Sequence, residues 1–253
     1  MRSYPLMRRL LSPLLALTVA GCGATTLPAI HSEPERLEVA RRMHDQGEYV
    51  VATELLKTYV ANNAGSADVD HAIYLLGHCH LKTKDWTGAG TEFERLLRDY
   101  PESDSSAAAR FGLAEAMFAQ SRPPDFDQDY TLKALDEWER YLRDFPGHWQ
   151  NDVAKDRILA CRSRLADKAV RNGVLYLKLR LTGPARVWFK KVATEYPDTM
   201  WVAEAEMGLA ICDAREGKRP EAIAQFKSIE ERYAGRPVAE KAARERKRLE
   251  RNS

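Results

Sequence analysis

Three copies of one spaced motif limit what this chain can fold into. In each copy an alanine is followed four residues later by an aromatic residue, and a proline follows eight residues after that. Proline cannot continue a helix, because it lacks an N–H group and clashes with the preceding turn. The motif therefore predicts a helix that ends at the same register each time, and such a repeat is typical of a solenoid. The copies are Ala89–Phe93–Pro101, Ala134–Trp138–Pro146 and Ala185–Phe189–Pro197.

Further positions match the tetratricopeptide repeat (TPR), a helical hairpin of about 34 residues. Gly77 follows Leu76 in the first helix of one copy, and Gly173 precedes Tyr176 in another. Weaker copies in "DQGEYVVATELL" and "REGKRPEAIAQF" bring the hairpins to five. Apolar residues recur with the period of a helix, and no stretch of alternating β-branched residues is bounded by turn signals. We therefore predict an all-α fold, a tetratricopeptide-repeat solenoid of about five helical hairpins.

The equivalent alanines of the five hairpins are unevenly spaced. Residues 52, 89, 134, 185 and 222 are separated by 37, 45, 51 and 37 positions, so the two central repeats are lengthened. We expect part of the first extra length in the loop "SRPPDFDQD" and the second in one long helix over "WQNDVAKDRILACRSRLADKAVRNG". The predicted repeats span about 35–64, 67–101, 105–146, 152–197 and 201–234, and a C-terminal capping helix follows.

The first 24 residues, "MRSYPLMRRLLSPLLALTVAGCGA", have the organisation of a signal peptide. Three arginines precede an apolar run from Leu10 to Val19, which is too short to cross a hydrocarbon core of about 30 Å. The run closes in "VAGC", which resembles a bacterial lipobox. We expect cleavage of residues 1–21 and lipidation of the Cys22 thiol. The alternative is an ordinary secretory signal with an incidental cysteine.

The residues after Cys22 bear on where the chain is held. We expect residues 22–34 to form a flexible, lipid-anchored tether. Gly23 stands where inner-membrane lipoproteins of well-studied bacteria carry an aspartate. By that resemblance the expected location is the outer membrane, with the chain facing the periplasm.

The charge balance bears on partners. The whole chain carries 39 basic and 37 acidic residues, and removal of residues 1–21 takes away three arginines and no acid. The mature balance is then 36 basic against 37 acidic residues, a net charge of −1. A balanced chain lacks the basic footprint of a nucleic-acid-binding protein, so we expect no nucleic-acid partner.

Cysteine and histidine residues suggest no metal centre. Cys79, Cys161 and Cys212 are too widely spaced for a zinc motif, and we expect them to be buried small side chains. In "HCH", His78 and His80 are two positions apart and point to different faces of a helix. His71 lies two turns from His78, about 10 Å along the axis, which is too far for one ion. We therefore predict no metal site.

Enzyme motifs are also lacking. The segment "TGAG" misses the third glycine and the Lys-Ser/Thr of a phosphate loop, and no GxSxG or HExxH pattern occurs. We expect a non-catalytic protein without a cofactor, apart from the covalent lipid on Cys22. The basic C-terminal segment, Lys241 to Arg251, is interpreted as a solvated capping helix, with contact to an anionic partner or lipid head groups as the alternative.

Four stretches together with the lipobox resemble the BamD family (YfiO-like) of outer-membrane lipoproteins, which belong to the β-barrel assembly machinery. They are "LLRDYPES", "DQDYTLKALDEWERYLRDFPG", "RILACRSRLADKAVRNGVLYLK" and "VATEYPDTMWVAEA". The resemblance implies a non-catalytic scaffold whose C-terminal repeats bind the POTRA domains of a BamA-like β-barrel protein. It also implies other assembly lipoproteins as neighbours, and unfolded outer-membrane proteins as substrates of the N-terminal repeats.

Site residues follow from the resemblance. A peptide groove on the first helices of repeats 1 and 2 would present Tyr74, His78 and Lys82. The family's POTRA-contacting arginine has no clean match; Trp188 stands near its place, with Arg186 and Lys190 as neighbours.

Two other functions stay open. A periplasmic TPR adaptor for cell-division, peptidoglycan or secretion machinery would more often carry a coiled-coil N-terminus and no lipid. A lytic-transglycosylase-like enzyme on a helical solenoid would need a catalytic glutamate in an appended domain.

Overall fold

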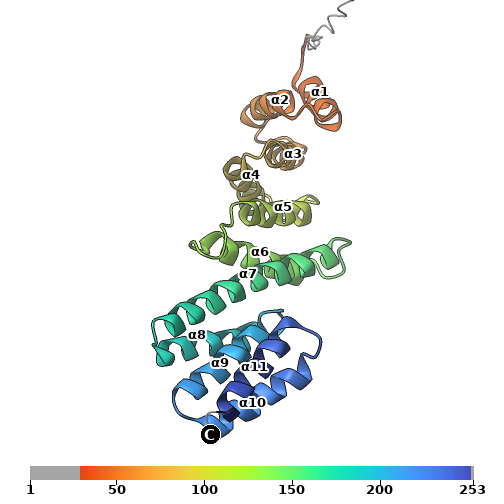
Figure 1. Ribbon diagram of the computed structural model, residues 1–253. Helices are drawn as coiled ribbons and strands as arrows, with labels where there is room; N and C mark the ends of the chain where they lie inside the picture. The colour runs from red at the N-terminus through yellow and green to blue at the C-terminus, as the bar shows by residue number, and fades with distance from the viewer. Residues whose placement is uncertain (1–28, 252–253) are drawn as a thin grey trace, which may run out of the picture.

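A computed structural model describes residues 29–251, which form an elongated stack of helices with the N-terminal hairpin at one end and the C-terminal helix at the other (Figure 1). The predicted TPR solenoid is confirmed: successive helices pack as antiparallel pairs, and α11 covers α9 and α10. The predicted signal peptide, Cys22 and most of the tether lie outside the described residues. The helices are α1 (Glu33–Asp45), α2 (Tyr49–Asn62), α3 (Val69–Lys82), α4 (Trp86–Asp99), α5 (Ser106–Ala119), α6 (Asp129–Asp144), α7 (Asn151–Lys178), α8 (Thr182–Glu195), α9 (Val202–Arg215), α10 (Arg219–Arg232) and α11 (Pro237–Arg251).

The three motif prolines end their helices as predicted. Helices α4, α6 and α8 stop two residues before Pro101, Pro146 and Pro197. The intervening aromatic residue leaves the helical region, with φ near −130° in each copy. A following proline favours this departure, because its ring disfavours the helical conformation of the preceding residue.

The turn inside four of the hairpins is built in one way. The second residue after the first helix takes a left-handed conformation, and the next N–H group donates back to a carbonyl five residues earlier, as in a Schellman motif. This left-handed position is a glycine in two of the hairpins. In the other two it is Lys84 or Arg180, which also have a positive φ. The four residues are Gly47, Lys84, Arg180 and Gly217.

Two aromatic rings lock consecutive hairpins together. Phe93 on α4 is fully buried between Gly77 on α3 and Gly112 on α5, where an added Cβ would lie 2.7 and 2.5 Å from its ring. Phe189 on α8 lies in the same way between Gly173 on α7 and Gly208 on α9, at 2.6 and 2.4 Å. At these four glycines the helix backbone contacts the phenylalanine ring directly, because no side chain lies between them.

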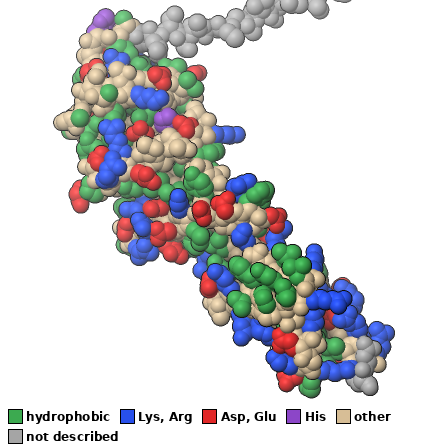
Figure 2. All heavy atoms as spheres, turned by 90° about the vertical axis from the view of Figure 1, so that its left-hand side faces the viewer, with side chains coloured by type: hydrophobic (Ala, Val, Ile, Leu, Met, Phe, Trp, Pro, Cys, Tyr) green, Lys and Arg blue, Asp and Glu red, His purple; other side chains and the backbone are tan. Residues whose placement is uncertain are grey.

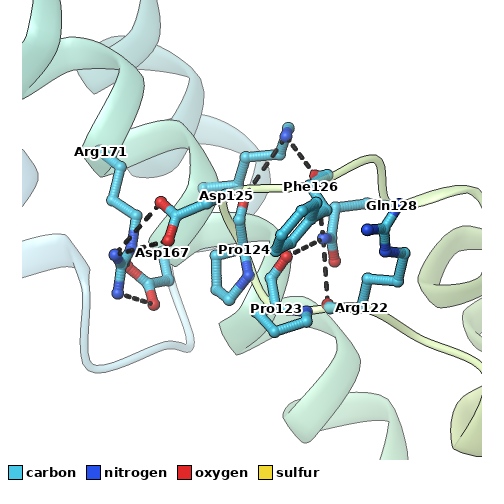
Figure 3. A network of polar contacts seen from close by, with 9 residues as sticks. Arg122, Pro123, Pro124, Asp125, Phe126, Gln128, Asp167 and Arg171 are labelled. Carbon is cyan, nitrogen blue, oxygen red and sulfur yellow. Dashed lines mark hydrogen bonds and ion pairs between the residues drawn. The ribbon is translucent and has the colours of Figure 1, made fainter.

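The two lengthened segments meet. Helix α7 has 28 residues, and the loop before α6 docks on its middle (Figure 3). The Lys168 ammonium donates to the carbonyls of Phe126 and Pro124 at 2.5 and 3.3 Å. Arg171 bridges Asp125 of the loop, at 3.3 Å, to Asp167 of its own helix, at 2.8 Å.

The same loop is braced from within. The buried Gln128 amide lies within 3.2 Å of four loop carbonyls, and its oxygen accepts from the Thr131 hydroxyl at 2.8 Å. The Arg122 guanidinium lies 4.0 Å from the centre of the Phe126 ring (Figure 3). The loop is thus a braced part of the third hairpin, and its contacts with α7 hold that hairpin to the fourth.

Candidate functional site

A cavity of about 420 Å³ opens between α3, α4 and α5. Its walls are mainly aromatic and apolar. Gln150, the residue just before α7, adds a polar side chain to the lining. This combination of apolar walls and a few convergent polar groups is typical of ligand sites. The lining residues are Tyr74, His78, Leu81, Lys82, Trp86, Phe93, Ala108, Phe111, Gly112, Glu115, Ala119 and Gln150.

All three residues assigned to the peptide groove line this cavity. Tyr74, His78 and Lys82 are spaced by four positions on α3, so they lie one above the other on a single helix face. The close approach of α3 and α5 around Phe93 brings the facing wall, with Phe111, near them.

The two charged side chains that line the cavity, Glu115 and Lys82, differ in whether they form an ion pair. Glu115 accepts from Arg157 of α7 at 2.8 Å and is thereby neutralised. Lys82 is exposed, and no carboxylate within residues 29–251 lies within ion-pair distance of its ammonium. The cavity therefore offers an available cation at the C-terminal end of α3.

His78 is held from the neighbouring hairpin. Its Nδ1 atom lies 2.7 Å from Nε2 of His44 on α1, and Nδ1 of His44 lies 3.0 Å from an Asp45 carboxylate oxygen. The rings of Tyr74 and His78 stack at 6.1 Å. Sequence reasoning compared histidines only within α3 and missed this pair; the signal was their separation of 34 residues, one repeat length.

Burial, together with His44 and Lys82 nearby, lowers the pKa of His78 from 6.5 to about 4. Burial also lowers the pKa of His71 and raises that of Tyr74. The charged and titratable groups around His78 are His44 and Asp45 on α1, Tyr49 on α2, and His71, Tyr74 and Lys82 on α3.

Stability should therefore fall in mild acid. Because the folded-state pKa of His78 lies below the unfolded value, its contribution is fully present above pH 6.5 and is lost as the pH falls towards about 4. We expect urea denaturation to show a smaller loss of stability over this window for His78→Gln than for the unaltered chain. An equal loss in both proteins would contradict the assignment.

The three residues assigned to the partner interface do not all lie on one face of α8. Arg186 and Lys190 line a second cavity of about 310 Å³ between α8, α9 and α10. Trp188 packs instead against the hydrophobic cluster around Phe189. Two positions of separation turn a side chain to a different helix face, so one surface cannot present all three.

Arg186 is already paired within the chain. Its guanidinium lies 2.7 Å from Asp213 and 2.8 Å from Glu216. Hydrogen bonds from Lys218 and Arg186 lower the pKa of Glu216 to about 2. This network ties α8 to the end of α9, and among the three predicted residues Lys190 is the exposed cation.

An exposed apolar patch lies where α7 and α8 meet, and the sequence analysis made no prediction for these residues. Val174, Leu175, Leu179 and Leu181, here called the α7–α8 patch, are 39 to 58% exposed. The turn is at the left of Figure 1, the side that faces the viewer in Figure 2, where hydrophobic side chains gather with Lys and Arg beside them. Lys178, Arg180 and Arg215 line a hollow at this turn.

Several other residues bear on the sequence expectations. Cys79, Cys161 and Cys212 are buried free thiols, and burial raises the pKa of Cys79 to about 11 and that of Cys161 to about 12.

In the described part of the chain, no cluster of three or more His, Cys, Asp and Glu side chains could hold a metal ion. Residues 29–251 also contain no helix long and apolar enough to span a membrane. On α11, Arg244, Arg246 and Arg248 each pair with a glutamate.

The chain is similar to one protein family and to solved TPR proteins. A family model described as "YfiO: Outer membrane lipoprotein" matches residues 78–216, more than half of the chain. A thermophilic TPR protein from Thermus thermophilus is 21% identical, with 84% of this chain and 97% of that chain covered and a TM-score of 0.38. A TPR protein from Bacteroides fragilis is 14% identical, with 88% and 96% covered and a TM-score of 0.46. No curated protein matches the chain significantly.

Proposed function

The chain belongs to the YfiO family of outer-membrane lipoproteins, and from this premise we propose that it is a non-catalytic scaffold of the β-barrel assembly machinery. The family consists of TPR scaffolds that are typically non-catalytic. In this proposal the N-terminal repeats receive unfolded outer-membrane proteins, and the C-terminal repeats bind the POTRA domains of a BamA-like partner. The lipid on Cys22 holds the chain to the outer membrane on its periplasmic side, beside other assembly lipoproteins.

The cavity between α3 and α5 is the observation that carries the substrate role. An unfolded outer-membrane protein exposes aromatic side chains on an extended backbone. The aromatic walls around Tyr74 and Phe111 can stack on such a ring, and the available Lys82 ammonium can donate to a carbonyl or carboxylate of the peptide.

Two features of the C-terminal half support a protein partner there. The α7–α8 patch supplies an apolar centre, and cationic side chains stand at its edge. An apolar core with a polar rim is the usual anatomy of a protein interface. Lys190 is an exposed cation on the same hairpin. We propose that this hairpin meets the POTRA-containing protein.

The substrate role is tested with a labelled peptide that carries aromatic residues. Alanine at Tyr74, His78 and Lys82 together should weaken binding by about tenfold or more, because aromatic and cationic anchors dominate such contacts. Alanine at Tyr130 and Lys133, an exposed aromatic–cation pair on α6, is the matched control and should leave binding unchanged. Unchanged crosslinking of the peptide to the triple variant would refute the assignment.

The partner is tested by affinity purification from detergent-solubilised outer membrane. We expect recovery of a large POTRA-containing β-barrel protein with the unaltered chain. Aspartate at Leu175 and Leu179 should abolish that recovery, whereas aspartate at Leu132, an exposed leucine on α6, should not. Recovery of cell-division or cell-wall proteins without the β-barrel would instead favour the periplasmic TPR adaptor.

A further inference from the structure

The hydrogen-bond chain behind His78 determines which of its nitrogens carries the proton. Asp45 can only accept, so Nδ1 of His44 is a donor and its Nε2, in a neutral ring, carries a lone pair. Nδ1 of His78 faces that lone pair at 2.7 Å and must donate to it. At pH 8, above the ordinary histidine pKa of about 6.5, His78 is therefore an Nδ1–H imidazole with a bare Nε2.

The His78 side chain lines the cavity, and within the described residues no protein group hydrogen-bonds to its Nε2. Among the other polar side chains of the lining, Glu115 is engaged by Arg157, and Lys82 has only donors. The Tyr74 hydroxyl and the Gln150 amide can accept, but each also carries donors of its own. Nε2 of His78 differs from them because it can only accept from a ligand.

The chain itself contains the bond that such a ligand would make. The Tyr141 phenol and Nδ1 of His148 lie 2.5 Å apart, at the end of α6. A phenol and an imidazole thus already lie within hydrogen-bond distance elsewhere on this scaffold. Tyr74 cannot fill that role at His78, because its ring is stacked on the imidazole rather than directed at an edge.

We propose that the cavity selects aromatic residues with a ring donor, tyrosine above all, over phenylalanine, and that His44 is the positioning residue which keeps the acceptor of His78 available. The inference rests on the proposed function, because it names the side chain that the same cavity takes. The phenol donates to Nε2 of His78 while its ring lies among Tyr74, Trp86 and Phe111. Tryptophan, whose indole N–H is also a donor, belongs to the same class.

The test compares two labelled peptides that differ only in Tyr or Phe at one position, by fluorescence anisotropy at pH 8. We expect about tenfold tighter binding of the Tyr peptide, the factor that corresponds to one net hydrogen bond. His78→Leu and His44→Leu should each abolish this preference while the Phe peptide still binds. Lys133→Ala, on α6 and outside the cavity lining, should keep it.

A second measurement separates positioning from packing. Nitrogen-15 NMR of the imidazoles should show His78 protonated at Nδ1 and bare at Nε2 in the unaltered chain, and the opposite, more usual tautomer in His44→Leu. Equal affinities of the two peptides for the unaltered chain would overturn this inference and leave the proposed function standing. Binding of neither peptide would overturn both.

Discussion

Replacing Gly208 by alanine should lower the free energy of unfolding by about 2–3 kcal/mol. The new Cβ would lie 2.4 to 2.5 Å from three ring atoms of Phe189. The ring cannot retreat, because its other side meets Gly173 on α7, where a Cβ would lie 2.6 Å away. Helices α7 and α9 must therefore separate, and the hairpin interface around Phe189 loses its close packing.

Urea denaturation measures this loss, and Gly90→Ala is the matched control. Gly90 lies inside α4, and the nearest atom to an added Cβ is a Leu113 methyl at 3.8 Å. With space available, alanine should raise stability by roughly 0.5–1 kcal/mol, the usual gain over glycine within a helix.

A double variant tests the mechanism. Phe189→Leu alone removes buried ring atoms and destabilises the chain. Combined with Gly208→Ala it should cost less than the sum of the two single changes, because leucine vacates the space that the new Cβ needs. Additive costs, or a Gly208→Ala variant as stable as Gly90→Ala, would show that the ring is not the obstacle.

Features written locally in the sequence were predictable. The helix stops before Pro101, Pro146 and Pro197 follow from proline chemistry at each site. Tyr74, His78 and Lys82 were chosen from the family resemblance, and their spacing of four positions places them on one face of α3. The helix stops needed only the residue and its neighbours, whereas the choice of the groove residues needed the family.

Features that depend on a second element were missed. The Asp125–Arg171 ion pair joins residues 46 positions apart, so the two lengthened segments were found but not their contact. Arg186 looked like an available cation because Asp213 and Glu216 lie on another helix. The contact between His44 and His78 also joins two elements, but it could have been predicted. The two residues are separated by one repeat length, and equivalent positions of neighbouring repeats lie side by side.

The α7–α8 patch was missed for a different reason. In "GVLYLKLRLT" leucine occupies every second position from 175 to 181, so on a helix these side chains lie on different faces. Leu177 of this stretch is buried, whereas Leu175 and Leu179 on either side are more than half exposed. Which apolar face a neighbour covers depends on how the hairpins stack, and no single segment encodes that.

Replacing Cys22 by serine should release the chain from membranes altogether. A serine hydroxyl cannot replace the thiol in the thioether to the lipid, and signal cleavage before a lipidated cysteine fails with it. Each acyl methylene adds about 0.8 kcal/mol of membrane partitioning, so losing several chains removes the anchor entirely. Cys22 lies outside the described residues, and this prediction stands on the lipobox-like "VAGC" alone.

Fractionation followed by mass spectrometry of the N-terminal peptide measures both membrane association and acylation. Cys79→Ser is the matched control, because that buried thiol should leave the chain in the membrane fraction. Gly23→Asp should keep the lipid but hold the chain at the inner membrane, which separates acylation from sorting. Unchanged outer-membrane association of Cys22→Ser would favour the ordinary secretory signal, and the chain would then be held there by its protein partners through surfaces such as the α7–α8 patch.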